Sequence, residues 1–461
     1  MMSGVNHPEV WVPLKFMDIL DVQGGTQPPK SQFVAEPQEG FIRLLQIRDF
    51  GSKPVPTYVP DTTKLKKCME DDLLIGRYGA SLGRICTGMQ GAYNVALAKV
   101  QAPDCIHKKF LKGYLESELF QGKLRLLSRS AQNGFNKGDL ESFDFFLPPL
   151  AEQKAIAEKL DTLLARVEST KARLERIPKI LKRFRQSVLA AAVSGKLTEE
   201  WRIREKTFQA ADGKARKIKV FRGIELAELP DGWLWLRFDQ VARIASNLVD
   251  PKTQPDSIHI APNHIESGSG LVSGFQTIKE DGVKSPKHKF YAGQILYSKI
   301  RPYLCKVAIA EFEGLCSADM YPIDALGSEK YLFRWMLTAQ FTDWASNAES
   351  RSVLPKINQK DLSQIPVPTP STEEQTEIVR RVDQLFAYAD TIENQVNNAL
   401  ERVNNLTQSI LAKAFRGELT EQWRKDNPDL ISGENSAEAL LEKIKAERAA
   451  AKPVKRGRKK A

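Results

Sequence analysis

Apolar side chains recur at alternating spacings of four and three residues along two stretches of the chain. This spacing is the pattern of a coiled-coil seam. The seam positions of the first stretch are Ile156, Leu160, Leu163, Val167, Leu174, Ile177, Leu181, Phe184 and Val188, with the polar Thr170 in one further slot. Those of the second stretch are Ile378, Val382, Leu385, Ala389, Ile392, Val396, Ala399, Val403, Leu406 and Ile410. Two helices of equal phase in one chain are predicted to pack against each other, each about 40 residues or ~60 Å long.

The two predicted helices differ in the middle and resemble each other at their ends. Pro178 lies inside the first helix, where the loss of a backbone hydrogen bond predicts a kink, whereas its counterpart Leu400 leaves the second helix unbroken. Each helix is followed by a glycine, Gly195 or Gly417, as expected where a helix ends.

The helical stretches belong to an internal duplication. Residues 147–202 align without a gap on residues 369–424, a shift of 222 positions that also takes Trp11 to Trp233. The chain is therefore two copies of one unit, each a variable block of about 140 residues followed by a helical block. The variable blocks share a skeleton but few side chains, which indicates a common frame carrying two different surfaces. We also expect the end of the second copy, Trp423-Arg424, to lie near Trp11.

Short apolar runs separated by Gly, Pro and Asn predict strands in the variable blocks, near 41–47, 73–75, 95–100 and 294–297. Helices are expected near 108–121 and 329–341. The predicted class is α/β (α+β), with two mixed domains. The predicted boundaries are a first domain at 1–150, a first spacer helix at 151–202, a linker at 203–224, a second domain at 225–370, a second spacer helix at 371–424, and a C-terminal helix near 435–450 with a basic disordered tail within 425–461.

Composition and charge narrow the class of partner and the compartment. The chain has 68 Lys and Arg against 57 Asp and Glu, a formal charge of +11, which favours a polyanionic partner without proving one. The five cysteines are widely spaced and form no C-x-x-C pair, so we expect no disulfide framework, no metal site and a reducing cytoplasm. No apolar run reaches the ~20 residues that a membrane helix requires, and the N-terminus lacks a signal-peptide profile.

Motifs for intrinsic catalysis are not found in the sequence. An amino-methyltransferase would need an Asn/Asp-Pro-Pro-aromatic motif, but the Pro-Pro pairs here are Pro28-Pro29 and Pro148-Pro149, without such neighbours. The phosphate-binding loop of a translocase and a convincing nuclease constellation are also not found. The sequence thus predicts a binding protein and not an enzyme.

The segments LPPLAEQKAIAEKLDTLLARV, RFRQSVLAAAVSGKLTEEWR and VNNALERVNNLTQSILAKAFRGELTEQWR closely resemble the repeated segments of type I restriction-modification specificity subunits (HsdS), with the closest likeness to the type IA group. In the variable blocks, DLLIGRYGASLGRI and ILYSKIRPYLCKVAIA are similar to the target-recognition domains of these subunits. The resemblance is most specific over about 147–202 and 367–450.

The resemblance implies a mechanism. Each recognition domain reads one half of an interrupted, asymmetric site in double-stranded DNA, and the two helices form an antiparallel coiled coil that sets the spacing of the domains. Two methyltransferase (HsdM) subunits, which bind S-adenosylmethionine, dock on the repeated helices. Two restriction and translocase (HsdR) subunits, which use ATP and Mg, complete the complex. The chain itself is expected to bind no cofactor.

Polar and basic side chains near strand ends and glycine turns are the candidates for contact with DNA. In the first domain these are Arg43, Gln46, Arg48, Arg77, Tyr78, Ser81, Arg84, Asn133 and Lys137. In the second they are Asn263, His264, Lys299, Arg301, Tyr303, Arg351, Lys356 and Gln359. The alternatives for each cation are a phosphate contact or a solvated position, and for the two tyrosines a place in the core.

Two other functions remain open from the sequence. The chain could be the specificity subunit of a related system in which methylase and nuclease are fused in one partner. It could also be a coiled-coil scaffold whose variable blocks bind proteins, since heptads alone permit this.

Overall fold

The structure, a computed structural model, describes residues 7–128, 134–205, 217–346 and 355–451. The chain divides into two compact units, unit 1 from Met1–Glu175 with Asn398–Ala461, and unit 2 from Arg176–Asn397. Each unit joins one variable block to parts of both helical stretches. Unit 1 is consequently built from two segments that are far apart in the sequence.

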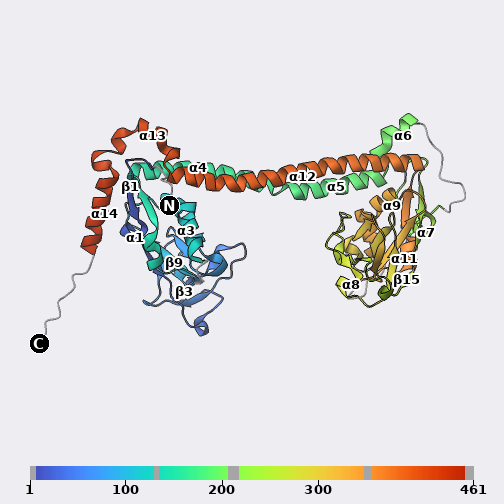
Figure 1. Cartoon of the computed structure of the whole chain (residues 1–461), viewed down its shortest axis with the longest axis horizontal. Helices are drawn as coiled ribbons and strands as arrows, with labels where there is room; N and C mark the ends of the chain where they lie inside the picture. Colours follow the sequence, from blue (N-terminus) through green and yellow to red (C-terminus); the bar gives the residue numbers. More distant parts are fainter. Residues whose placement is uncertain (1–6, 129–133, 206–216, 347–354, 452–461) are drawn as a thin grey trace. The chain divides into compact units, whose positions relative to one another are not determined.

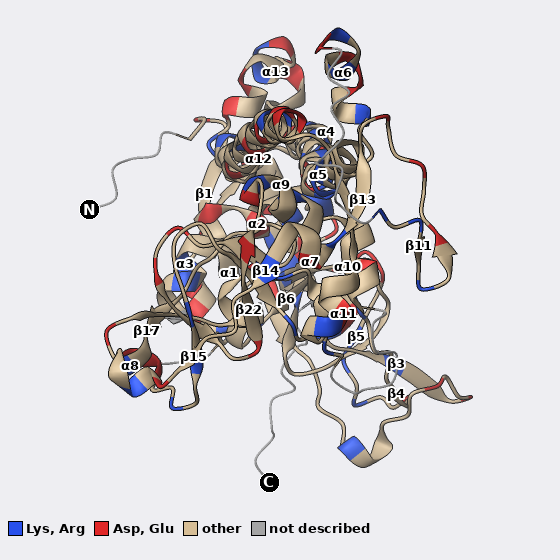
Figure 2. Cartoon of the chain, turned by 90° about the vertical axis from the view of Figure 1, so that its right-hand side faces the viewer, with Lys and Arg blue, Asp and Glu red and all other residues tan. Residues whose placement is uncertain are grey.

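Unit 1 mixes strands and helices in its described residues. Its strands are β1 (Val12–Lys15), β2 (Asp21–Gly24), β3 (Phe41–Leu45), β4 (Tyr58–Pro60), β5 (Lys67–Cys68), β6 (Leu74–Gly76), β7 (Ile85–Cys86), β8 (Gly91–Tyr93), β9 (Leu97–Gln101) and β10 (Asp144–Leu147). Its helices include α1 (Phe16–Ile19), α2 (Lys108–Glu116), α3 (Glu118–Ser128), α4 (Leu150–Leu174), α13 (Glu421–Asp426) and α14 (Ala437–Ala451). Figures 1 and 2 both show β3 on the side of this unit that is remote from α4.

Unit 2 repeats this architecture. Its strands are β11 (Val220–Phe221), β12 (Ile224–Glu225), β13 (Leu234–Arg237), β14 (Ala242–Ile244), β15 (Leu248–Val249), β16 (Ile258–Ile260), β17 (Gln276–Thr277), β18 (Lys287–Phe290), β19 (Ile295–Ser298), β20 (Val307–Ile309), β21 (Gly314–Ser317), β22 (Met320–Ala325) and β23 (Pro366–Thr369). Its helices include α5 (Ile177–Val193), α6 (Glu199–Glu205), α7 (Phe238–Val241), α8 (Ile278–Asp281), α9 (Glu329–Met336), α10 (Ala339–Ser346) and α11 (Gln359–Gln364).

The strands of unit 1 have counterparts in unit 2, which adds β15 at the edge of one sheet and the hairpin of β11 and β12. The order β2-β9-β6-β7 in unit 1 matches β14-β22-β19-β20 in unit 2, and the pair β1-β10 matches β13-β23. In the other sheet β3 runs parallel to β8, as β16 runs parallel to β21. These matches confirm the duplicated α/β frame that the sequence predicts.

The first helical stretch is broken and the second is continuous. Helix α4 ends at Leu174 and α5 begins at Ile177, with Pro178 in the first turn of α5, whereas α12 runs unbroken over Thr372–Phe415. The predicted kink at Pro178 is therefore a break, because a proline in the first turn of a helix lacks only an N–H that would have no intrahelical partner.

The two glycines that follow the helical stretches have the backbone that the sequence predicts. Gly195 and Gly417 have φ of 74° and 78°, in the left-handed region. This conformation ends a helix at little steric cost only when the residue lacks a Cβ.

The helices of each unit pack along the predicted seam. In unit 1 the seam side chains Ile156, Leu160, Val167 and Ile410 share one hydrophobic cluster, and in unit 2 the side chains Val188, Ile378 and Val382 share another.

Ion pairs and hydrogen bonds show the direction of the helices in unit 2. Arg185 of α5 binds Asp390 and Glu393 of α12. Arg381, which comes earlier in α12, donates to the carbonyl of Leu197, which follows α5. Helix α5 and the first part of α12 therefore run antiparallel.

Leu406 departs from the predicted seam, since it is 47% exposed. The prediction that Leu406 is a seam position is wrong. The seam passes from the half-buried Val403 through the half-buried Thr407 to the buried Ile410. The reason is that a helix with 3.6 residues per turn drifts away from an apolar repeat of 3.5 residues.

In each unit a buried carboxylate joins the start of one repeat to the end of the other. In unit 1 the hydrogen-bond donors to Glu152 are Trp11, Thr420 and Arg424. The predicted proximity of Trp11 and Arg424 is confirmed, because both bind the same side chain. In unit 2 the donors to Glu374 are the equivalent residues, Trp233, Thr198 and Arg202.

Two segments outside the repeats are also folded. Within the segment predicted as a linker, α6 extends to Glu205, and β11 and β12 form an antiparallel hairpin. Helix α14 lies where a C-terminal helix is predicted, and its Leu440, Leu441 and Ile444 are buried in the core of unit 1. Residues 206–216 of the predicted linker and the predicted tail from 452 onward lie outside the described residues.

Candidate nucleic-acid interface

The loop after β6 is tied to the segment that precedes β10. Arg77 donates hydrogen bonds to the carbonyls of Val95 and Phe135, at 3.4 and 3.3 Å, and its guanidinium lies 5.0 Å from the ring centroid of Tyr78. Tyr78 forms a β-bridge with Gly134. Its side chain remains 44% exposed, so Tyr78 is a surface aromatic and not a core residue.

Unit 2 builds the same loop with different side chains. Ile300 bridges Lys356, as Tyr78 bridges Gly134. Arg301 takes the place of Gly79, and both residues have left-handed backbone, with φ of 48° and 58°. An arginine is uncommon in this conformation, and its amide is fixed by a hydrogen bond to the Pro355 carbonyl at 2.8 Å.

A turn after β3 gathers two other candidates of unit 1. This turn, η2 (Ile47–Phe50), is capped because the backbone amide of Gln46 donates to the carboxylate of Asp49 at 2.7 Å. The side chains of Gln46 and Arg48 both donate to the hydroxyl of Thr57, at 3.3 and 3.2 Å. The side-chain amide of Gln46 and the guanidinium of Arg48 are therefore both held by the hydroxyl of Thr57.

The equivalent turn in unit 2 is η7 (Pro262–His264), which follows β16. Here the amide of Ala261 donates to Nδ1 of His264 at 3.1 Å, so His264 replaces Asp49 as the cap. His264 is only 8% exposed, and burial lowers its pKa. This position does not support the prediction that His264 contacts DNA, because the buried ring holds the turn instead. Its neighbour Asn263 is exposed.

Each turn is connected to the loop of its own unit. In unit 1 the guanidinium of Arg84 donates to the carbonyl of Phe50, and Ser81 is half-buried in the same loop. In unit 2 the ammonium of Lys306 donates to the carbonyl of Pro262 at 2.6 Å. The structure thus brings most of the candidates of each unit into one connected group.

Several of the cationic candidates are already paired with acidic side chains. Lys137 and Lys356 form ion pairs with Asp21 and Asp319, at 2.6 and 3.6 Å. Arg43 faces the buried Asp49 at 3.6 Å. These cations must leave or share their partners to contact a phosphate.

Other candidates of unit 2 are not paired with an acidic side chain among the described residues. Lys299 lies 5.4 Å from the ring centroid of Tyr321. Among the described residues, the side chain of Arg301 has neither an ion pair nor a hydrogen bond, and Arg301, Tyr303 and Gln359 are all exposed. The candidates Asn133 and Arg351 lie outside the described residues. Contact with DNA stays a prediction for all of these positions.

Acidic side chains lie between the basic ones on several helices. Figure 2 shows Lys and Arg interspersed with Asp and Glu along α6, α8 and α13. These three helices therefore offer no continuous basic stripe to a polyanion.

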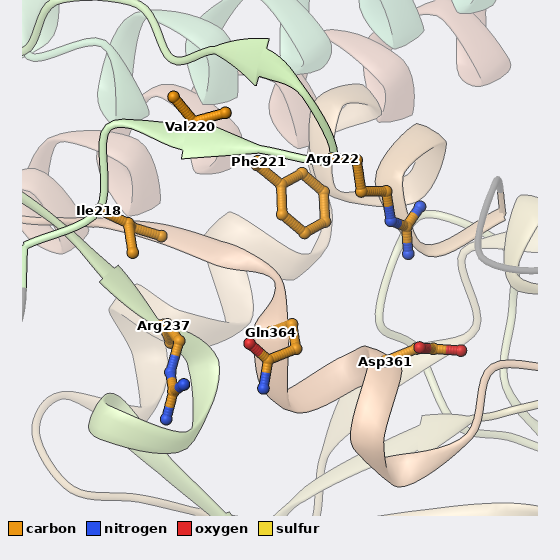
Figure 3. Close-up of a pocket in the computed structure, with 7 residues that line it drawn as sticks. All are labelled: Ile218, Val220, Phe221, Arg222, Arg237, Asp361 and Gln364. Atoms are coloured by element: carbon orange, nitrogen blue, oxygen red, sulfur yellow. The ribbon is translucent and has the colours of Figure 1, made fainter.

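A pocket in unit 2 lies beside the hairpin of β11 and β12, as Figure 3 shows. Its polar lining consists of Arg222, Arg237, Asp361 and Gln364. Arg237 donates to Asp239 through two hydrogen bonds of 3.0 and 2.8 Å. Arg222 donates to a backbone carbonyl at 3.0 Å, and Asp361 accepts from an asparagine amide at 2.8 Å. The charged side chains of the lining thus already have hydrogen-bond partners, and the lining offers no nucleophile beside a base.

The described part of the chain shows neither a metal site nor a membrane-spanning helix. Its His, Cys, Asp and Glu side chains form no group of three that could hold a metal ion. Its helices include none that combines the length and the apolar character needed to cross a bilayer.

Asp49 and Thr57 are the residues of this interface that sequence reasoning missed. Asp49 could have been found as the acidic residue three positions after Gln46, a spacing typical of a capped turn. Thr57 gives no such signal, because it approaches Gln46 and Arg48 only through the pairing of β3 with β4.

Comparison with known proteins gives consistent matches. The chain matches the family described as Type I restriction modification DNA specificity domain over residues 8–179 and 245–402. The type I restriction enzyme EcoDI specificity subunit of Escherichia coli is 65% identical over 346 residues, covering 74% of this chain and 78% of that protein. The EcoKI specificity subunit of Escherichia coli strain K12 is 36% identical over 493 residues, covering 100% of both chains.

Solved structures share the fold at low sequence identity. The HsdS subunit from Thermoanaerobacter tengcongensis has a TM-score of 0.54 and 16% identity, covering 89% of this chain and 98% of that chain. A chain from a structure that describes complex assembly and conformational transition of the type I R-M system has a TM-score of 0.61 and 16% identity, covering 90% of this chain and 99% of that chain.

Proposed function

The chain belongs to the family of type I restriction-modification DNA specificity subunits, and from this membership we propose that it selects the DNA target of a type I complex. Each unit reads one half of an interrupted target. The likeness to the type IA group favours a complex in which modification and restriction reside in separate partner subunits.

The observation that carries this proposal is one frame with two sets of side chains. At equivalent places unit 1 has Gln46 and Arg48 where unit 2 has Ala261 and Asn263, although the backbone turns are capped in the same way. Base edges in the major groove are distinguished by the donors and acceptors that face them. Two different sets on one frame therefore read two different half-sites, and the target is asymmetric.

The repeated helices indicate how partners are arranged. Two methyltransferase subunits bind one to each repeat, because each repeat offers a similar helical surface, and two restriction and translocase subunits complete the complex. S-adenosylmethionine binds to the methyltransferase subunits, and ATP and Mg bind to the restriction subunits. The chain contributes recognition and positioning, and the chemistry takes place in its partners.

The experiment is a map of adenine methylation over a whole genome. Cells that express this chain together with a type IA methyltransferase subunit are compared with cells that express the methyltransferase alone. The expected result is a new asymmetric, interrupted motif with one methylated adenine on each strand. If the two proteins co-purify and bind S-adenosylmethionine but no motif appears, the assignment is overturned.

A further inference from the structure

Thr57 holds two candidate DNA-contacting side chains at once. It is buried, and its hydroxyl accepts hydrogen bonds from Gln46 and Arg48 while donating to the carbonyl of Val55 at 3.4 Å. A hydroxyl has one hydrogen to donate and two lone pairs to accept. All three are used here, so neither Gln46 nor Arg48 can turn away without leaving an acceptor site of the buried hydroxyl unsatisfied.

Asp49 fixes the same turn from the other side. Its carboxylate is buried, accepts from the amide of Gln46 and faces Arg43. The backbone of Thr57 is in turn anchored to β3, because its carbonyl accepts from the amide of Leu44 at 2.8 Å. The turn, the strand and the two side chains therefore form one connected group.

After its hydrogen bond to Thr57, the side chain of Gln46 still has one donor and one acceptor available. One hydrogen of the side-chain amide goes to Thr57, and no other hydrogen bond of this side chain occurs among the described residues. A second N–H and the carbonyl oxygen remain. A donor and an acceptor side by side on an amide match the N7 and N6 edge of adenine.

We propose that Thr57 and Asp49 are positioning residues that hold Gln46 and Arg48 toward DNA, and that Gln46 reads an adenine base in the half-site of unit 1. This inference rests on the proposed function. Arg48 is exposed and keeps further N–H donors for a guanine or for the backbone phosphate.

Unit 2 shows which parts of this group belong to the frame. In the strand pairing, Gln276 stands where Thr57 stands in unit 1, and it is exposed. Ala261 replaces Gln46 and has no polar side-chain group to hold. The cap is kept in both units, but among the described residues the anchored side-chain amide occurs at this turn in unit 1 alone, as expected of a feature that serves recognition and not folding.

The test compares variants of the full chain, each co-expressed with the methyltransferase subunit. Thr57→Val removes the acceptor and keeps the shape, Thr57→Ser keeps the hydroxyl, and Gln46→Ala removes the amide. Thr87→Val is the matched control, because among the described residues the hydroxyl of Thr87 bonds only the carbonyl of Glu70, on another loop. Methylation maps give the motif for each variant, and binding to DNA with single substitutions gives the discrimination at each position.

The expected result is that Thr57→Val and Gln46→Ala both weaken the preference for the same base pair in the same half-site. Discrimination there should fall by about 5- to 150-fold, which is the effect of losing one good bidentate contact. Thr57→Ser and Thr87→Val should keep the wild-type motif, and the other half-site should be unchanged in all variants. A purely structural role would lower the melting temperature without changing which base is preferred.

Different outcomes separate the parts of the inference. If Gln46→Ala relaxes a base pair and a folded Thr57→Val does not, the positioning role is overturned. If Gln46→Ala leaves the motif intact, the reading role is overturned. If Thr57→Val does not assemble, Thr57→Cys, which has a weaker acceptor, decides the positioning role by the same measurement. A wild-type chain that directs no motif overturns the proposed function instead.

Discussion

Trp11 donates its indole N–H to Glu152 at 2.8 Å, and this bond joins the start of the first repeat to the first turn of α4. Trp233 and Glu374 repeat it in unit 2 at 2.8 Å. In each unit an arginine from the end of the other repeat completes the site. The duplication is therefore closed by two equivalent buried carboxylates.

Replacing Glu152 should destabilise unit 1 selectively. In Glu152→Gln the largely buried Arg424 loses its counter-charge, and breaking such a pair costs about 3–5 kcal/mol of the free energy of unfolding. Hydrogen exchange in increasing urea would show earlier opening of unit 1 amides. Glu374→Gln is the matched variant and should shift the effect to unit 2. Equal loss in both units would contradict the closure of each unit by its own carboxylate.

Gly417 should reject a side chain. Its φ is 78°, and an added Cβ would collide with Pro8, so Gly417→Ala should cost more than the ~1–2 kcal/mol of left-handed strain alone. Gly223 has the same φ of 78° with nothing near its missing Cβ, which makes Gly223→Ala the control. Urea denaturation should rank Gly417→Ala below Gly223→Ala in stability, and the reverse order would refute the packing argument.

The exposed Leu406 should accept a charge that its seam neighbour rejects. Leu406→Glu replaces a solvent-facing side chain and should change the free energy of unfolding by no more than about 0.5 kcal/mol. Ile410→Glu places an unpaired charge in the core and should unfold unit 1 or destabilise it severely. Thermal unfolding of the full chain provides the comparison. Similar losses for both variants would restore Leu406 to the seam.

The salt dependence of DNA binding should show whether Arg301 contacts a phosphate. Since its side chain has no partner among the described residues and its backbone is fixed, we expect it to contact a phosphate. Arg301→Ala should then weaken binding to all DNA sequences alike and lower the slope of log K against log salt by about 1. The measurement is a titration of target and non-target duplexes at several salt concentrations. Loss confined to one base pair of the target would show base reading instead.

His264 should make unit 2 sensitive to acid. Burial is the largest cause of its lowered pKa, Asp281 and a backbone hydrogen bond with His259 oppose this shift, and the charges of His259 and Lys306 act in the same direction as burial. A histidine whose folded pKa lies below its unfolded value of about 6.5 contributes stability above pH 6.5, and this stability is lost as the pH falls through the folded pKa. The stability of unit 2 should therefore drop as the pH falls below about 6.5.

The variant His264→Asp provides the control for this titration. Asp49 shows that a carboxylate caps the same turn in unit 1, so an aspartate at position 264 should hold the turn without titrating between about pH 7 and 5. The stability of His264→Asp should then fall less over this range than that of the wild type. Equal pH slopes, measured by urea denaturation at each pH, would exclude His264 as the titrating group.

Much of this protein is determined by the sequence alone. The duplication, the two helical stretches, the glycines that end them and the family resemblance all follow from patterns between residues close in the chain or from direct identity. The proximity of Trp11 and Arg424 follows from the duplication, because the end of the second repeat is predicted to lie beside the start of the first. The mixed α/β class follows from the alternation of short apolar runs and turn residues.

Tertiary structure alone decided which side chains are free to act. His264 and Asn263 are neighbours in the sequence, yet one is buried as a cap and the other is exposed. Thr57 becomes important only because β4 places its hydroxyl beside Gln46, and Leu406 leaves the seam because a real helix drifts from the ideal repeat. Burial and hydrogen bonding depend on contacts between residues distant in the chain, and a local pattern carries no record of those contacts.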